Sequence, residues 1–354
     1  MCEVPMNVEN HETRAYSPGR VNLIGDHTDY NEGLALPMAV DLGTTVTFVA
    51  DTSHRVVLCS AEEPELAEVD LHVRFDAELL QAFEPRWARY VAAMVALAQP
   101  RYGGRGTVDT TLPVGAGLSS SASLEVALAL AFGFEAEPVT MATTCQRAEQ
   151  AATGVPSGLM DQLVVSEAAD GCALLVDFAD LSTRQVHMPE QLEVVVVHCG
   201  ERRTLDHSPY TSRRAECEAA AFGLGPLGHV SPGDLVGISD PLLRRRARHV
   251  VTECDRVRWC ASALESADLA EAGRLMTASH RSLAQDFEVS TRALDDLVDH
   301  LLCMPGVFGA RLTGAGFGGC VVALTEPGAV DLTALRTPAW RVRPSAGAHL
   351  LSGF

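Results

Sequence analysis

The structure of this chain is constrained most by a glycine- and serine-rich loop that runs directly into an apolar stretch. Residues 115–123 read Gly-Ala-Gly-Leu-Ser-Ser-Ser-Ala-Ser, and residues 124–134 are almost entirely apolar. Glycine lets a backbone approach a ligand closely, and the first turn of a helix offers unpaired N–H groups and partial positive charge. The segment therefore predicts a loop and helix start that hold an anion such as phosphate. A serine-rich helix cap without a ligand is the alternative.

The chain contains no lysine, so all 27 of its basic residues are arginine. The P-loop pattern G-x-x-x-x-G-K-[ST] is therefore excluded. Gly115 and Gly117 match the first two glycines of a dinucleotide-binding G-x-G-x-x-G motif, but Ser120 stands in the third position. That motif also needs a second strand after the helix, whereas residues 139–150 have a helical pattern. A phosphate would be held here by backbone amides, hydroxyls, arginine and a metal ion.

Length and charge narrow the class of protein. A chain of 354 residues suits two domains, and a net charge of −19 argues against binding nucleic acid or an anionic membrane. The ten cysteines include no C-x-x-C pair or zinc-like spacing, and no apolar run is long enough to span a bilayer. We expect a cytoplasmic protein without a leader segment, with buried free thiols and small-molecule partners.

Hydrophobic periodicity predicts a chain that mixes strands and helices. We expect strands at residues 44–50, 55–60 and 106–112, then helices at 86–98, 118–134 and 140–152. Two nearly continuous apolar strands follow at 172–178 and 192–198. The region after residue 209 is mainly helical, at 242–264, 269–283 and 291–304, and a strand returns at 320–324. A domain boundary is expected near residues 175–190.

Two further segments carry candidate chemistry. Asp26, His27 and Asp29 follow a glycine that ends an apolar stretch, and clustered acceptors suit a neutral polyhydroxylated ligand. The calcium-loop spacing is absent, and a solvated turn is the alternative. Asp161 follows a Gly/Pro-shaped turn and lies twelve residues after Glu149. A rigidly held carboxylate suits proton transfer, and Glu149 could hold a cation near the serines. Taken singly, each acid is more often a solvated surface group.

Together these segments resemble the galactokinase branch of the GHMP small-molecule kinases, over nearly the whole chain. Residues 18–30 resemble its signature, residues 113–123 its ATP loop and residues 312–320 its third motif, a glycine loop that would otherwise be a hairpin connection. Residues 158–162 resemble the segment with the catalytic aspartate, and residues 210–217 the segment with the sugar-contacting tyrosine. Even residues 343–348 resemble the family's last strand. Several matches in the right order are far more specific than any one of them.

The resemblance implies a two-domain α/β (α+β) fold with the active site in the cleft between the domains. Residues 1–180 would form a domain with a mixed sheet, and residues 181–354 a domain with an antiparallel sheet and helices. The implied reaction is ATP-dependent phosphorylation of the anomeric hydroxyl of galactose, with Mg²⁺, in a monomer or weak oligomer. Asp161 would be the base, and Arg20 would favour its ionised form and stabilise the transferring phosphoryl group.

The remaining implied roles are in binding. The sugar would be bound by Asp26, His27, Thr28, Asp29 and Tyr210. ATP would be bound by Ser60, Gly115, Ala116, Gly117, Leu118, Ser119, Ser120 and Ser121. Ser121 and Glu149 would hold Mg²⁺ between the β- and γ-phosphates.

One departure keeps the substrate open. The family usually has glutamate at position 26, where this chain has aspartate, which is one methylene shorter. That residue typically contacts the sugar hydroxyl farthest from the reacting end. Another sugar, an amino sugar or a cyclitol is therefore an alternative substrate. A non-catalytic sensor that binds sugar and ATP is a further alternative, but such relatives lose part of the serine loop, which is intact here.

Overall fold

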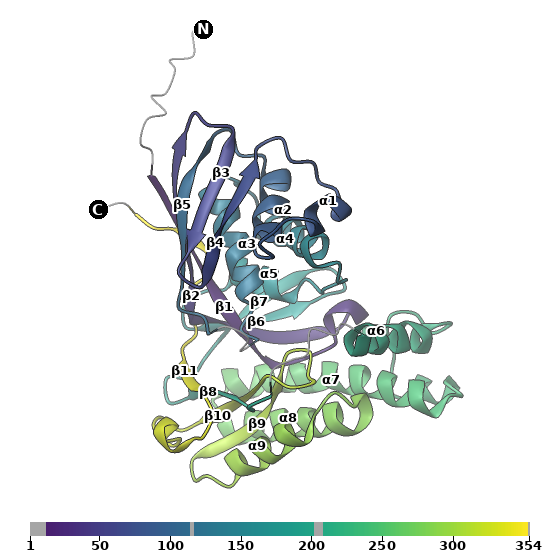
Figure 1. Ribbon diagram of the computed structural model, residues 1–354. Coiled ribbons are helices and arrows are strands. Elements are labelled where there is room, and N and C mark those ends of the chain that lie inside the picture. The colour runs from purple at the N-terminus through teal and green to yellow at the C-terminus, as the bar shows by residue number, and fades with distance from the viewer. Residues whose placement is uncertain (1–11, 114–116, 202–207, 353–354) are drawn as a thin grey trace.

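The chain forms two units, each built on its own β-sheet, that meet along a shared apolar core (Figure 1). This computed structural model describes residues 12–113, 117–201 and 208–352. Within them the mixed first sheet and the antiparallel second sheet confirm the predicted two-domain α/β class.

The first unit contains an eight-stranded mixed sheet. Its strands are β1 (Glu12–Ile24), β2 (Leu34–Asp51), β3 (Arg55–Ser60), β4 (Glu63–Asp70), β5 (Gly103–Thr110), β6 (Cys172–Asp177), β7 (Ser182–His187) and β12 (His349–Leu350). The main path runs β12-β1-β2-β5-β3-β4, while β6 pairs with β2 and β7 pairs with β6. Among the described strands of this sheet, β3 and β5 are the only parallel neighbours. The four strands expected in this unit are present, and β2 begins earlier than its β-branched run suggested.

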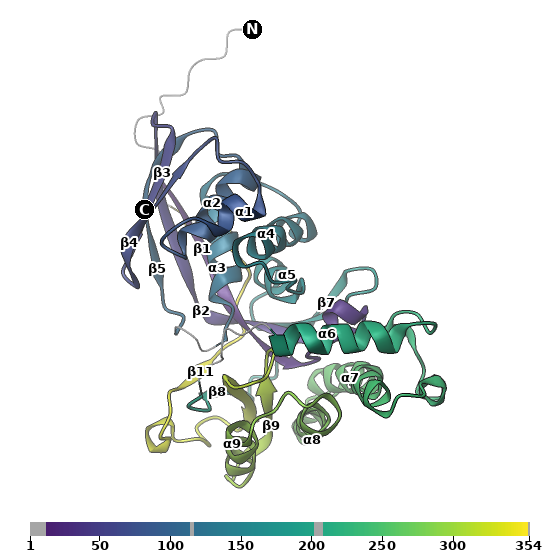
Figure 2. The same cartoon turned by 45° about the vertical axis from the view of Figure 1, so that its right-hand side comes forward.

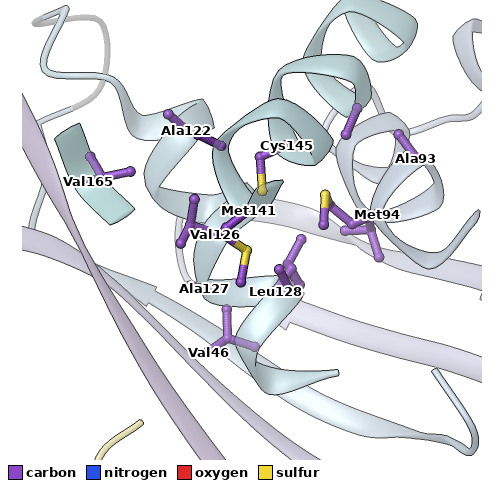
Figure 3. Close-up of a cluster of buried hydrophobic side chains, with 14 of the residues drawn as sticks. Val46, Ala93, Met94, Ala122, Val126, Ala127, Leu128, Met141, Cys145 and Val165 are labelled. Carbon is purple, nitrogen blue, oxygen red and sulfur yellow. The ribbon is translucent and has the colours of Figure 1, made fainter. Parts of the chain in front are cut away.

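Helices of the first unit cover one face of this sheet (Figures 1 and 2). They are α1 (Ala77–Gln81), α2 (Ala88–Ala98), α3 (Ser120–Ala131), α4 (Pro138–Thr153) and α5 (Met160–Glu167). The expected helices correspond to α2, α3 and α4, whereas α1 and α5 were not expected. Figure 3 shows the core between them, where buried side chains from the sheet and four helices meet: Val46, Met94, Val126, Cys145 and Val165.

The second unit is a four-stranded antiparallel sheet packed with long helices. Its strands are β8 (Glu193–His198), β9 (Val307–Thr313), β10 (Cys320–Thr325) and β11 (Ala339–Val342), in the order β11-β8-β10-β9. Its helices are α6 (Ser208–Ala221), α7 (Pro241–Glu265), α8 (Leu269–Ser282) and α9 (Arg292–Leu302). The strands and helices expected after residue 190 are confirmed. Figure 2 shows α6 lying along the junction with the first unit.

Strand β8 explains why its sequence is a continuous valine run. Val194 and Val196 belong to the core that the second sheet shares with β1 and β2. Val195 and Val197 point the other way, into the core that includes α9. Because side chains alternate along a strand, a strand covered on both faces needs apolar residues at every position.

The first sheet also contains strands that come after the predicted domain boundary in the sequence. Residues 182–187 form β7 in the first sheet, although they follow the boundary predicted at 180/181, and residues 349–350 return to pair with β1. The boundary itself stays a prediction. Among the described helices, none has both the length and the apolar character that a membrane span requires. The nine described cysteines are free thiols.

Candidate functional site

A cavity of about 300 Å³ lies where the two units meet. Its lining residues come from β1 and the turn after it, from α4, α5 and the loop between them, from α6 and from the β9–β10 loop. They are Arg20, Asp26, His27, Asp29, Tyr30, Glu149, Val155, Ser157, Gly158, Met160, Asp161, Pro209, Tyr210, Gly314, Ala315, Gly316 and Phe317. The cavity is rich in carboxylates and aromatic rings, as a site for a small polar ligand should be.

Arg20 and Asp161 form a bidentate ion pair on the cavity wall, although 141 residues separate them. The Nε of Arg20 lies 2.6 Å from Oδ1 of Asp161, and Nη2 donates to Oδ2. The third nitrogen, Nη1, donates to the carbonyl of Gly117 at 2.8 Å. Ser119 also donates its hydroxyl to Oδ2 of Asp161. Three donors therefore fix this carboxylate beside the start of α3.

The start of α3 is arranged as an open helix terminus. Its N-cap residue, Ser119, has a left-handed backbone (φ 60°) and makes no side-chain capping bond, because its hydroxyl is bonded to Asp161. The N–H groups of the first turn are therefore left for a ligand. Two residues on, the Ser121 hydroxyl donates to Oε1 of Glu149 at 2.6 Å.

These two oxygen groups are the kind of ligands that a hard divalent cation takes, with its other positions filled by phosphate oxygens and water. Among the described residues, those of the site included, no three or more His, Cys, Asp or Glu residues form a group that could hold a metal ion by itself.

The turn after β1 presents the acidic cluster. Gly25 has φ 98° and His27 has φ 65°, so the chain reverses sharply here. The Thr28 hydroxyl stabilises the turn as a hydrogen-bond donor, with its oxygen 2.8 Å from the carbonyl oxygen of Gly25 and 2.7 Å from that of Leu34. The Thr28 side chain is fully buried. Nε2 of His27 lies 3.3 Å from the carbonyl of Ala315, which can only accept. Nε2 therefore carries the proton, and Nδ1 accepts from the Tyr30 hydroxyl at 2.9 Å. Burial lowers the pKa of His27 to about 3, so the ring is neutral.

Asp29 follows in the same turn and, like Asp161, lines the cavity. The pKa of Asp29 is raised to about 6, mainly by burial and also by the negative charges of Asp161 and Asp26, while backbone hydrogen bonds oppose the rise. Above that pH the carboxylate is an acceptor only, which suits hydroxyl groups. The ring of Tyr210, from α6, lies with its centroid 5.9 Å from those of His27 and Tyr30 and closes this side.

Asp26 is held from the second unit. Its Oδ2 pairs with Nη2 of Arg311, and its Oδ1 accepts from the N–H of Gly314 at 3.1 Å. Both side chains are almost fully buried. Burial raises the pKa of Asp26, and the charge of Arg311 opposes that effect. The backbone carbonyl of Asp26 accepts from His249 at 3.2 Å. Asp26 thus ties the turn after β1 to the β9–β10 loop.

The structure gathers most of the predicted site residues around one cavity. Its lining includes both predicted catalytic residues, the predicted cation ligand Glu149 and every predicted sugar ligand except Thr28, which lies behind the wall. Of the ATP residues, Gly117 and Ser119 bond Arg20 and Asp161, Leu118 is buried and Ser120 is exposed. Ser60, at the end of β3, does not line the cavity. Gly115 and Ala116 lie outside the described residues.

Three buried ionisable residues near the site were not predicted. Arg311 pairs with Asp26, and Glu253 of α7 accepts from the N–H of Gly25 at 3.0 Å. Glu125 of α3 is fully buried and bonded to Gln162. Glu125 and Arg311 each interrupt an apolar stretch of their element, which was the signal available in the sequence, whereas Glu253 lies in a polar part of α7 and gave no such signal.

Comparison with known protein families gives three matches. The galactokinase galactose-binding signature matches residues 7–49. The GHMP kinases N terminal domain matches residues 89–167, and the GHMP kinases C terminal description matches residues 260–336. The three matched ranges contain the turn after β1, the start of α3 with Asp161, and the β9–β10 loop.

Individual relatives agree with these matches. Galactokinase from Homo sapiens is 41% identical over 335 residues, covering 90% of this chain and 85% of that protein. Galactokinase from Chloroflexus aurantiacus is 39% identical over 343 residues, covering 90% and 85%. The crystal structure of Lactococcus lactis galactokinase complexed with galactose superposes with a TM-score of 0.87 at 28% identity, covering 96% of this chain and 95% of that one. Methanococcus jannaschii mevalonate kinase shares the fold (TM-score 0.65, 18% identity, covering 96% and 99%).

Proposed function

The chain belongs to the galactokinase family of the GHMP kinases, and we propose that it transfers the γ-phosphoryl group of ATP to the anomeric (C1) hydroxyl of galactose. The products are galactose 1-phosphate and ADP. One structural observation supports the proposal most directly. A carboxylate fixed by arginine, Asp161 with Arg20, lies on the wall of a sugar-sized cavity and beside a helix start that suits phosphate.

Asp161 acts as the base. Arg20 Nε occupies one position on Oδ1, while Arg20 Nη2 and Ser119 donate to Oδ2. A carboxylate has about four lone-pair positions, so one on Oδ1 is left for the proton of the C1 hydroxyl. As that proton moves to Asp161, the sugar oxygen attacks the γ-phosphorus and ADP leaves with the electron pair of the broken P–O bond. Arg20 stabilises the charge that spreads over the transferring group.

The loop of residues 115–121 and the first turn of α3 bind the triphosphate of ATP. Ser121 and Glu149 would hold Mg²⁺, and their adjacent oxygens support this assignment. The ion would neutralise phosphate charge and help to position the triphosphate. Ser60 is retained as a nucleotide contact on the resemblance alone.

The sugar is bound by Asp29, His27 and Tyr210, with Asp26 at the end of the cavity formed with the β9–β10 loop. Asp29 accepts from sugar hydroxyls, and neutral His27 and the aromatic rings give the apolar face of the sugar a surface. Thr28 contributes by holding the turn rather than by facing the cavity.

A second candidate function is phosphorylation of another sugar, an amino sugar or a cyclitol by the same machinery. The observation that favours it is at Asp26, whose two oxygens are both engaged by Arg311 and Gly314. A sensor without catalytic activity is disfavoured, because Arg20 and Ser119 both donate hydrogen bonds to Asp161 and so hold the proposed base in place.

The remaining assignments rest on the sequence and the thiols. The partners are ATP and a small sugar. The protein would be a monomer or weak oligomer, since the residues that line the cavity all come from one chain. The free thiols support a reducing cytoplasm.

The experiment that tests the function is a substrate panel. Purified protein with Mg²⁺ and ATP is assayed for kcat/KM on hexoses, pentoses, amino sugars and cyclitols. We expect galactose to rank first. If another compound ranks far above galactose, the kinase assignment stands and the second candidate replaces the first. If no compound is phosphorylated while ATP and galactose both bind, the sensor interpretation is correct.

A further inference from the structure

Glu125 is a buried acid beside the catalytic machinery that the proposed mechanism does not use. It lies on α3 four residues after Ser121, so it is one turn deeper on the same face of the helix. Its side chain is fully buried, and every other residue of α3 from Leu124 to Ala131 is apolar. An apolar side chain would serve the packing better, because burying a carboxyl group costs free energy unless its oxygens are bonded. The position therefore calls for a role other than stability.

Glu125 has one hydrogen-bonding partner among the described residues. Its Oε2 accepts from Nε2 of Gln162 at 3.2 Å, while its Oε1 is buried without a partner. Gln162 follows Asp161 directly in α5 and is also fully buried. Within the described chain, the side-chain hydrogen bond of Glu125 thus goes to the neighbour of the proposed base.

Gln162 connects Glu125 to the proposed cation ligand. The same Nε2 lies 2.8 Å from Oε2 of Glu149. An amide nitrogen carries two hydrogens, so one goes to each acid and the orientation of the amide is determined. The other oxygen of Glu149, Oε1, accepts from Ser121. Both oxygens of Glu149 are therefore held by donors that belong to this group of residues.

The contacts form a closed ring of four side chains. It runs from Glu125 to Gln162, from Gln162 to Glu149, from Glu149 to Ser121, and back along one turn of α3 to Glu125. The ring joins α3, α4 and α5, the three helices that carry the proposed triphosphate, cation and base residues. Groups that bond the ligands of a metal typically set their orientation.

We infer that Glu125 is a positioning residue, which anchors the Gln162 amide and through it orients the Glu149 carboxylate for the cation that accompanies the nucleotide. The inference rests on the proposed function, and it deepens the cation part of it. What Glu125 supplies is an acceptor oxygen at a fixed place. A side chain of the same length that keeps that oxygen should keep the function, and one that lacks it should lose it.

The test compares Glu125→Met with Glu125→Gln. Methionine keeps length and volume but has no oxygen, whereas glutamine keeps an acceptor. Leu128→Met is the matched control, since Leu128 is a fully buried residue of the same helix outside the ring. The main readout needs no turnover: binding of ADP is titrated at increasing Mg²⁺. Steady-state kcat, galactose KM and Tm are measured alongside.

For Glu125→Met we expect the Mg²⁺ concentration for half-maximal ADP binding to rise, and kcat to fall, each by about 10- to 100-fold. Galactose KM and Tm should stay near wild type. Glu125→Gln and Leu128→Met should behave like wild type. Gln162→Met breaks the ring from the other side, so it should reproduce the Mg²⁺ defect, and the double variant should be no worse than either single variant.

Unchanged Mg²⁺ dependence in both folded methionine variants of the ring would overturn the inference. So would equal impairment of Glu125→Gln and Glu125→Met, because the acceptor oxygen would then not be what matters. If Glu125→Met does not fold, Gln162→Met decides. If wild type phosphorylates no sugar, the proposed function fails, but the Mg²⁺ and ADP titration still tests the ring.

Discussion

Gly158 leaves the space that the carboxylate of Asp29 occupies: a Cβ on Gly158 would lie 1.5 Å from Oδ2 of Asp29. The loop before α5 therefore sets the position of a side chain from the turn after β1. The absence of a side chain at residue 158 is a requirement of the cavity, independent of any backbone strain.

The first prediction is that Gly158→Ala displaces Asp29 without unfolding the protein. The colliding atom is the end of a side chain that can rotate away, so stability should change little. The sugar should lose an acceptor, and kcat/KM for the sugar should fall by about 100-fold, the scale of a 1 Å misplacement. Sugar titration and ADP titration together check this. Gly237→Ala is the control, because no atom lies within 4 Å of the added Cβ. Normal sugar binding by Gly158→Ala would contradict the role of Asp29.

A second prediction concerns pH. The pKa of Asp29 is raised from 3.8 to about 6, with burial as the main cause. Activity should therefore need the ionised form, and kcat/KM for the sugar should fall as pH drops below about 6. A profile that is flat from pH 7 down to pH 5 would contradict this assignment.

The same shift has the opposite sign for stability. A carboxyl whose pKa is raised by folding destabilises the fold when it is ionised, so its cost is absent below pH 3.8 and is complete above about pH 6. Asp29→Asn removes the charge. Its Tm should match wild type near pH 4, exceed it increasingly up to pH 6 and then keep a constant margin, while sugar binding is lost. Thermal melts of both proteins across this range measure the difference.

A third prediction tests the base. Asp161→Asn keeps the shape of the side chain and one acceptor for Arg20 but cannot take a proton. We expect turnover to fall by roughly 10²- to 10⁴-fold while ADP still binds. A pre-steady-state assay of sugar phosphate formation is the measurement. Retained turnover with the same pH profile would show that another group accepts the proton.

Local sequence patterns predicted some of the site residues but not others. The loop before α3 and the acids near residues 26 and 161 were recognised because each has a local pattern of glycine, serine or clustered carboxylates. The Arg20–Asp161 pair was expected only through the resemblance, because no local pattern joins positions 141 residues apart. Helix α5 was not expected, since it is eight residues long and follows a loop rich in Gly and Pro.

Buried ionisable residues were the least predictable part of the site. Glu125 and Arg311 lie in apolar elements, and their partners come from other elements, 37 and 285 residues away in the chain. Periodicity gives the face of an element on which a residue lies, but not which element packs against it. The pattern could therefore show that these charges are unusual without showing what they bond.

The fourth prediction concerns the buried pair of Asp26 and Arg311. Both side chains are almost fully buried, and two of the three guanidinium nitrogens of Arg311, Nε and Nη1, have no partner among the described residues. Asp26→Asn would leave the buried guanidinium of Arg311 without its ion-pair partner, and we expect a loss of about 3–5 kcal/mol in the free energy of unfolding.

Arg311→Met should cost a similar amount, because it leaves Asp26 unpaired. The double variant should cost clearly less than the sum of the two, since neither charge then remains buried. Denaturant unfolding of the four proteins measures this coupling. Additive losses would mean that the two groups do not form a pair in solution. In that case Asp26 would be free to face the sugar, and its replacement would change the ranking of sugars rather than the stability.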